Sequence, residues 1–142
     1  MRVLAEHGIE IYNTDEMGNN ALHLSARFDS RFNILDMLVK SRYNLDLQNK
    51  SGDTATHIAA QKGNLRALES LIANGADIDM RNEHSLSPLY LAILNENMEC
   101  VEILLENGAS VFYDGSNREK DRSPIFLAIR NQQKEMLTSI FD

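Results

Sequence analysis

The chain has little of what several classes of protein require. Its 142 residues include one cysteine, which excludes an internal disulfide framework and favours a reducing compartment. No apolar run approaches the length that spans a bilayer, so membrane insertion is not expected. The formal net charge is -7 and no basic stripe is present, which argues against binding to nucleic acid or to an anionic membrane surface. The remaining composition is typical of one folded domain.

What the chain does have is a short string that recurs at a fixed interval. Each copy begins with a residue that can cap a helix: Asn20, Thr54, Ser87 and Ser123. Successive copies are 34, 33 and 36 residues apart. A second string keeps the same step, from Asn74 to Ile78 and again from Asn107 to Val111. A period of about 33 residues indicates stacked supersecondary units.

Each unit is predicted to contain two helices. The capping residue starts a short first helix, and proline directly after the cap suits its first position. The predicted first helices are Ala21–Phe28, Ala55–Lys62, Pro88–Asn95 and Pro124–Asn131. Apolar residues at helical spacing predict second helices at Arg31–Lys40, Leu65–Ala73, Met98–Glu106 and Lys134–Phe141. Gly, Asn and Asp between the units predict a projecting two-stranded finger.

Two stretches carry a family resemblance. Gly52 to Ala60 reads GDTATHIAA, and Leu71 to Asp77 reads LIANGAD. These stretches resemble the ankyrin repeat motif, which has Gly-x-Thr-Pro-Leu-His-x-Ala-Ala after a finger and Asn-Gly-Ala-Asp after the second helix. The resemblance implies an all-α repeat solenoid of stacked helix-turn-helix units with β-hairpin fingers. We interpret residues 1–142 as a single ankyrin repeat domain with these parts: a partial repeat at 1–12, repeats at 13–46, 47–79 and 80–112, and a terminal or truncated repeat at 113–142.

Several residues depart from that motif. Thr56 replaces the usual leucine, which should weaken one layer of the core. Ser85 and Asp121 stand where the motif has glycine, so those turns must accept a side chain or change shape. Tyr90 and Phe126 replace the histidine. Neither end has the polar outer face that a terminal repeat needs, so we expect a longer array or a partner that covers the ends.

The histidines and the cysteine, which are residue types that often form catalytic or metal sites, have structural explanations in this chain. His23 and His57 occupy equivalent positions, but no Cys or carboxylate cluster completes a metal site. The resemblance implies that these imidazoles tie neighbouring turns together. Cys100 occupies an apolar position without a local base, as an inert buried thiol would. The chain has no Gly-x-Ser-x-Gly elbow and no phosphate-binding loop, so we expect no enzyme activity, cofactor or metal.

The resemblance implies that a partner docks on a concave face formed by the fingers and the first helices. Residues at finger tips and first-helix ends are the candidates, with Phe28, Lys62, Arg81 and Leu94 as expected hot spots. The full set of candidates is Glu16, Met17, Asn19, Arg27, Phe28, Lys50, Ser51, Asp53, Gln61, Lys62, Arg81, Glu83, His84, Leu86, Leu94, Asn95, Arg130 and Asn131. Met17, Phe28, Leu86 and Leu94 are expected to be exposed apolar residues on that face.

The leading interpretation is a non-catalytic protein–protein interaction module within a larger adaptor or regulatory protein. Its expected partner is another protein or a peptide, alongside further repeats or domains of the same polypeptide. Two alternatives stay open: a substrate-recruiting segment of a larger multidomain enzyme, and a structural spacer. A cytoplasmic or nuclear location is the accompanying expectation.

Overall fold

A computed structural model describes residues 13–28, 34–41, 43–112, 123–131 and 133–141. The predicted partial repeat at 1–12 and the turn at Asp121 lie outside these ranges. The helices in chain order are α2 (Ala21–Arg27), α3 (Ile34–Val39), α4 (Ala55–Lys62), α5 (Leu65–Ala73), α6 (Pro88–Leu94), α7 (Met98–Glu106), α8 (Pro124–Arg130) and α9 (Lys134–Phe141). No helix among the described residues is long and apolar enough to cross a membrane.

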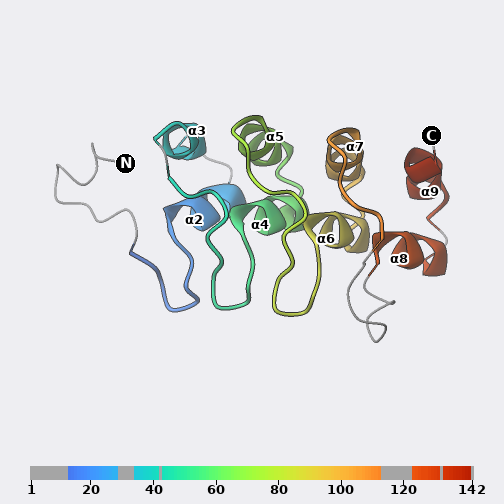
Figure 1. Cartoon of the computed structure of the whole chain (residues 1–142), viewed down its shortest axis with the longest axis horizontal. Coiled ribbons are helices and arrows are strands. Elements are labelled where there is room, and N and C mark those ends of the chain that lie inside the picture. The colour runs from blue at the N-terminus through green and yellow to red at the C-terminus, as the bar shows by residue number, and fades with distance from the viewer. Residues whose placement is uncertain (1–12, 29–33, 42, 113–122, 132, 142) are drawn as a thin grey trace.

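The helices form two layers along one axis (Figure 1). The first helix of each unit, α2, α4, α6 or α8, lies in the layer from which the fingers project, and we call these four the inner helices. The second helices, α3, α5, α7 and α9, form the other layer and are called the outer helices. Consecutive inner helices contact one another, as do consecutive outer helices. This arrangement is the predicted all-α repeat solenoid.

Side-chain caps fix where the inner helices begin. The Thr54 hydroxyl accepts from the His57 amide, while the His57 ring accepts from the Thr54 amide at 3.0 Å, which completes a capping box. Asn20 forms the equivalent box at the start of α2, and Ser87 caps α6 by accepting from the Tyr90 amide. All four predicted first-helix starts are confirmed: caps explain those of α2, α4 and α6, and Pro124 at the first position suits that of α8. The helices α2, α6 and α8 end one residue earlier than predicted.

A continuous apolar seam joins the units. The small residues Ala26, Ala59, Ala92 and Ala128 are 0% exposed, as close contact between neighbouring inner helices requires. Leucines such as Leu68, Leu71 and Leu104, also 0% exposed, fill the space between the two layers. Thr56 is fully buried in this seam, and its hydroxyl has no hydrogen-bond partner among the described residues. The weakening of this layer stays a prediction, which the cost of burying an unpaired hydroxyl supports.

The fingers differ from the predicted β-hairpins, since the described residues contain no strand. Each of the three described fingers is a loop closed by two backbone hydrogen bonds, such as Asn49 N–H to the Asp53 carbonyl and Gly52 N–H to the Asn49 carbonyl, at 2.9 Å each. An Asn or Asp side chain at the start of each loop takes the amides that a two-stranded ladder would use. A left-handed residue then turns the chain: Gly18 and Gly52 in the first two loops, and Ser85 with φ 63 in the third. Ser85 therefore accepts the turn that the motif assigns to glycine.

The last unit exposes positions that are covered elsewhere in the stack. Ile93 on α6 is 0% exposed, whereas Ile129 at the equivalent position on α8 is 51% exposed. Tyr90 and Phe126 show the same contrast, at 6% and 45%. The neighbouring unit covers these positions in α6, so their exposure in α8 marks an uncovered stacking face.

Candidate binding surface

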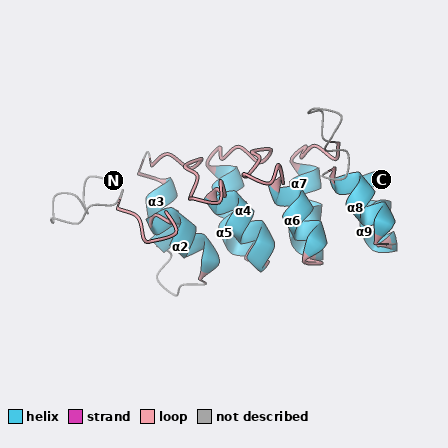
Figure 2. Cartoon of the chain, turned by 90° about the horizontal axis from the view of Figure 1, so that it is seen from below, coloured by secondary structure: helices cyan, strands magenta, loops and turns pink. Residues whose placement is uncertain are grey.

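Two rows of residues border the face formed by the fingers and inner helices, which we call the inner face. The inner helices begin beside the fingers and end at the opposite edge of this face (Figure 2). The fingertip row lies on the finger edge and comprises Glu16, Met17, Lys50, Ser51, Glu83 and His84. The helix-end row lies on the opposite edge and comprises Arg27, Phe28, Gln61, Lys62, Leu94, Asn95, Arg130 and Asn131. All members of both rows are exposed except Ser51, which is partly buried.

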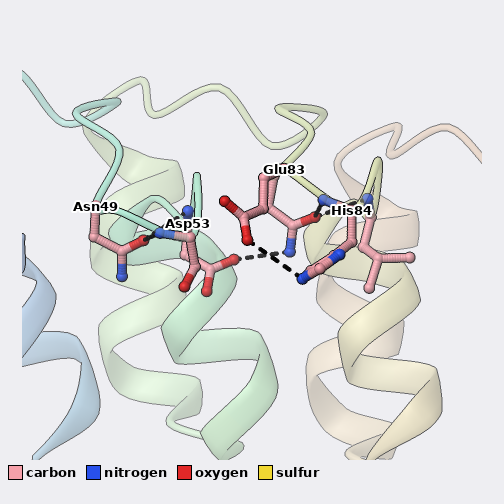
Figure 3. Close-up of polar contacts among 7 residues, drawn as sticks. Asn49, Asp53, Glu83 and His84 are labelled. Atoms are coloured by element: carbon pink, nitrogen blue, oxygen red, sulfur yellow. Dashed lines mark hydrogen bonds and ion pairs between the residues drawn. The ribbon is translucent and has the colours of Figure 1, made fainter. Parts of the chain in front are cut away.

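One polar side chain per unit shapes each fingertip. Asn49 Oδ1 accepts from the amides of Ser51 and Asp53 at 2.9 and 3.0 Å. Asn82 Oδ1 does the same for His84 and Leu86 in the third unit, at 3.0 Å each. Figure 3 shows these contacts, with Asn49 beside Asp53 and the Glu83 carboxylate reaching the His84 ring at 3.5 Å. This local bonding presents successive fingertips in the same orientation.

Hydrogen bonds between fingers hold the row together. The Lys50 amide donates to the Met17 carbonyl, and the Glu83 amide donates to the Ser51 carbonyl, at 3.0 Å each. The spacing is tight, because a Cβ added to Gly52 would lie 2.5 Å from the Glu83 nitrogen. The fingers therefore form one connected edge.

Side-chain amides of Asn and Gln form the hydrogen bonds that connect neighbouring units along the helix-end row. Asn64 donates to the Ala26 carbonyl at 3.0 Å, and Asn97 donates to the Ala60 carbonyl at 2.7 Å. Gln133 reaches the Ile93 carbonyl at 3.2 Å. Each donor belongs to the next unit, so carbonyls near the ends of α2, α4 and α6 are satisfied across the unit boundary. This bonding places each helix end in a fixed relation to its neighbour.

The two motif histidines link units below the fingertips. His57 is fully buried, and its Nε2–H donates to the Leu86 carbonyl of the next unit at 2.9 Å. His23 makes the same bond to the Asp53 carbonyl at 2.8 Å. Burial lowers the pKa of both imidazoles, although these hydrogen bonds act in the opposite direction. Both rings are therefore neutral structural groups at pH 7.

Other reactive groups are equally constrained. Burial raises the pKa of the Cys100 thiol to about 11, so it is protonated and poorly nucleophilic at neutral pH. Hydrogen bonds from the Asn19 backbone and side chain, and from the Met17 amide, lower the pKa of Asp15, which shapes the first fingertip. Within the described part of the chain, no group of three His, Cys, Asp or Glu side chains could hold a metal ion.

Most predicted site residues lie on the two rows, but four lie between the rows: Asn19, Asp53, Arg81 and Leu86. Asn19 is 7% exposed and accepts from the Asn49 amide group at 2.8 Å. Asp53, partly buried, accepts from the Asn82 side chain at 2.9 Å. Both therefore tie fingers together. Arg81 is also partly buried. Their role in binding remains a prediction.

The predicted exposure of Leu86 is wrong. Its side chain is 9% exposed, because its amide is held by Asn82 and its carbonyl by His57, which draw the residue into the stack. Met17, Phe28 and Leu94 are exposed as predicted, at 56%, 61% and 50%.

Residue-level prediction missed the side chains that shape the fingertips. Asp15 and Asn49 were not singled out, and Asn82 counted only as a turn residue, although each accepts two backbone amides in its loop. A signal was available, since these three residues recur 34 and 33 positions apart. Short polar acceptors at the repeat period are typical of a shared turn.

Comparison with known proteins identifies a family whose model matches the chain. A family model described as "Ankyrin repeats (3 copies)" matches residues 25–115 and 56–142. These two matches overlap and together extend over both layers of the stack. A search of curated proteins returned no match.

Proposed function

The chain belongs to the ankyrin repeat family, and we propose that it is a non-catalytic module that binds a protein or peptide partner on its inner face. Ankyrin repeats are in general protein–protein interaction modules. The proposal adds which face binds and which side chains carry the contact. Stacked repeats offer an extended surface that a partner can follow across several units.

One observation carries the proposal: two large apolar side chains are exposed at the ends of inner helices. Phe28 follows α2 and is 61% exposed, and Leu94 ends α6 and is 50% exposed. At the corresponding end of α4 stand Gln61 and Lys62. Because exposed apolar area gains free energy when it is buried, Phe28 and Leu94 are favoured contact points for a partner.

The state of the histidines and of Cys100 supports the proposal that the module is non-catalytic. The ring nitrogens of His23 and His57 form hydrogen bonds within the stack, and the Cys100 thiol is buried and protonated. A general base or nucleophile needs access to a substrate, which none of these groups has. Binding requires only the exposed rows.

The test is capture of partners by the purified chain, compared with a double variant, Phe28→Ala with Leu94→Ala. We expect this variant to lose the specific partners of the wild type while keeping its circular dichroism spectrum and melting temperature, since both side chains are at least half exposed.

The matched control lies on the other layer. Ile34→Ala with Met37→Ala removes two apolar side chains from outer helix α3, where they are 43% and 57% exposed. We expect this control to retain the partners. If the Phe28 and Leu94 variant retains every partner, the inner face is not the binding surface.

A further inference from the structure

Charge is distributed unevenly between the two layers. Three inner helices carry a cation in the last turn: Arg27 in α2, Lys62 in α4 and Arg130 in α8. None of the outer helices α3, α5, α7 and α9 does. The helix-end row thus holds three cations and no carboxylate in a chain whose formal net charge is -7.

Stabilisation of the helix termini does not account for this pattern. A cation near a helix C-terminus interacts favourably with the helix dipole, but that effect would apply equally to the outer helices. Carbonyls near the ends of α2 and α4 already accept from Asn64 and Asn97 of the next unit. Stabilisation of the helix ends therefore does not explain why these cations are present.

The three cations are also available to a partner. None of them forms an ion pair with a described residue, and the Arg27 guanidinium lies 5.8 Å from the centre of the Phe28 ring. That contact places a positive charge beside an exposed apolar surface. A partner that offers a carboxylate next to an apolar side chain would satisfy both groups at once.

We propose that the helix-end row binds an extended acidic peptide segment that runs along the axis of the stack; this inference rests on the proposed function. Packed helices lie about 8–10 Å apart, and an extended chain advances about 3.3 Å per residue, so one unit corresponds to about three peptide residues. A carboxylate opposite Arg27 at peptide position 1 thus predicts a second at position 4 and a third opposite Arg130 at position 10. The cation for position 4 is Lys62, one residue after Gln61, which is the equivalent of Arg27, and its long side chain supplies the reach.

The third unit predicts a different residue type at position 7 of the bound peptide. Leu94 stands where the other units have Arg27, Gln61 or Arg130, and the exposed Glu96 lies two residues after the end of α6. Peptide position 7 therefore takes an apolar residue, because a carboxylate there would meet no cation and would lie close to Glu96. A uniform polyanion such as nucleic acid would place negative charge at this position, so an acidic–apolar peptide fits better.

The experiment uses fluorescein-labelled synthetic ten-residue peptides and fluorescence anisotropy with the full chain. The patterned peptide has Asp at positions 1, 4 and 10, Leu at position 7 and Ser elsewhere. The permuted peptide exchanges positions 4 and 7. We expect the patterned peptide to bind about tenfold more tightly than the permuted one, and its affinity to fall as salt is raised.

A charge exchange identifies the contact. Lys62→Glu should weaken the patterned peptide about tenfold, and replacing Asp at peptide position 4 by Lys should restore the affinity. Lys40→Glu is the control, because Lys40 is an exposed cation directly after outer helix α3. It should leave binding unchanged. Melting temperatures of both variants establish that each is folded, and Lys62→Gln provides a milder second variant.

Three results would overturn the inference. These are equal affinity for the patterned and permuted peptides, an equal loss of affinity in Lys40→Glu, and tighter binding of a single-stranded oligonucleotide than of the patterned peptide. Each leaves the proposed function intact if the Phe28 and Leu94 double variant still loses its partners. Retention of partners by that double variant would instead remove the proposed function itself.

Discussion

Replacing His57 with alanine removes one of the hydrogen bonds that tie the second unit to the third. The His57 ring accepts from the Thr54 amide at 3.0 Å and donates to the Leu86 carbonyl at 2.9 Å. Both partners are buried, Thr54 at 0% and Leu86 at 9% exposure. The Leu86 carbonyl also accepts from the Asn82 amide at 3.0 Å, so it would keep one partner, whereas the Thr54 amide would lose the His57 ring that accepts from it.

The cost follows from those two groups. Leaving the buried Thr54 amide without a hydrogen bond costs about 1–3 kcal/mol, and losing one of the two bonds to the Leu86 carbonyl costs about 0.5–1.5 kcal/mol, which gives about 1.5–4.5 kcal/mol in total. A small domain has a free energy of unfolding of about 5–15 kcal/mol, so this is a large fraction of the total. Since a repeat protein is stabilised by contacts between neighbouring units, the loss should also weaken the coupling between the second and third units.

The assay is urea denaturation followed by circular dichroism. We expect His57→Ala to lower the free energy of unfolding by at least about 1.5 kcal/mol and to broaden the transition. The control is Tyr90→Phe at the equivalent position of the next unit, with an expected loss below about 1 kcal/mol. A loss below about 1 kcal/mol for His57→Ala itself would refute the reasoning.

Two further predictions concern acid and burial. Because the pKa values of His23 and His57 are lowered in the folded state, the unfolded chain takes up protons first; stability should be complete above about pH 6.5 and fall as the pH drops below it. Urea midpoints at several pH values check this, and an acid dependence unchanged in His57→Ala would contradict a contribution from that ring. Ile93→Ser should cost about 2–5 kcal/mol and Ile129→Ser below about 1 kcal/mol, since their exposures are 0% and 51%. Equal losses in thermal melts would show that the α8 position is covered in solution.

Much of the fold follows from local chemistry that repeats at a fixed step. The predicted bounds of α5, α7 and α9 are those observed, and all four inner helices start where predicted. A cap and a proline act within one turn of the helix, so their effect can be read from neighbouring residues. The period then places one unit relative to the next.

The fingers could not be predicted in the same way. Turn residues indicated a projecting loop, but whether it forms two strands depends on which groups take its amides. Asn49 takes two of them; its recurrence with Asp15 and Asn82 indicates a shared turn, but which amides it accepts depends on the loop geometry. The burial of Leu86 likewise depends on a contact with His57 from the preceding unit. Non-local contacts of this kind decide which residues of the inner face remain exposed.

The most direct test of binding at the inner face is site-specific photo-crosslinking. A photoreactive amino acid is placed in turn at Phe28, at Leu94 and, as the outer-layer control, at Met37, whose exposures are 61%, 50% and 57%. The account predicts crosslinks to the captured partner from positions 28 and 94 and none from position 37. Crosslinks from position 37 alone would contradict it.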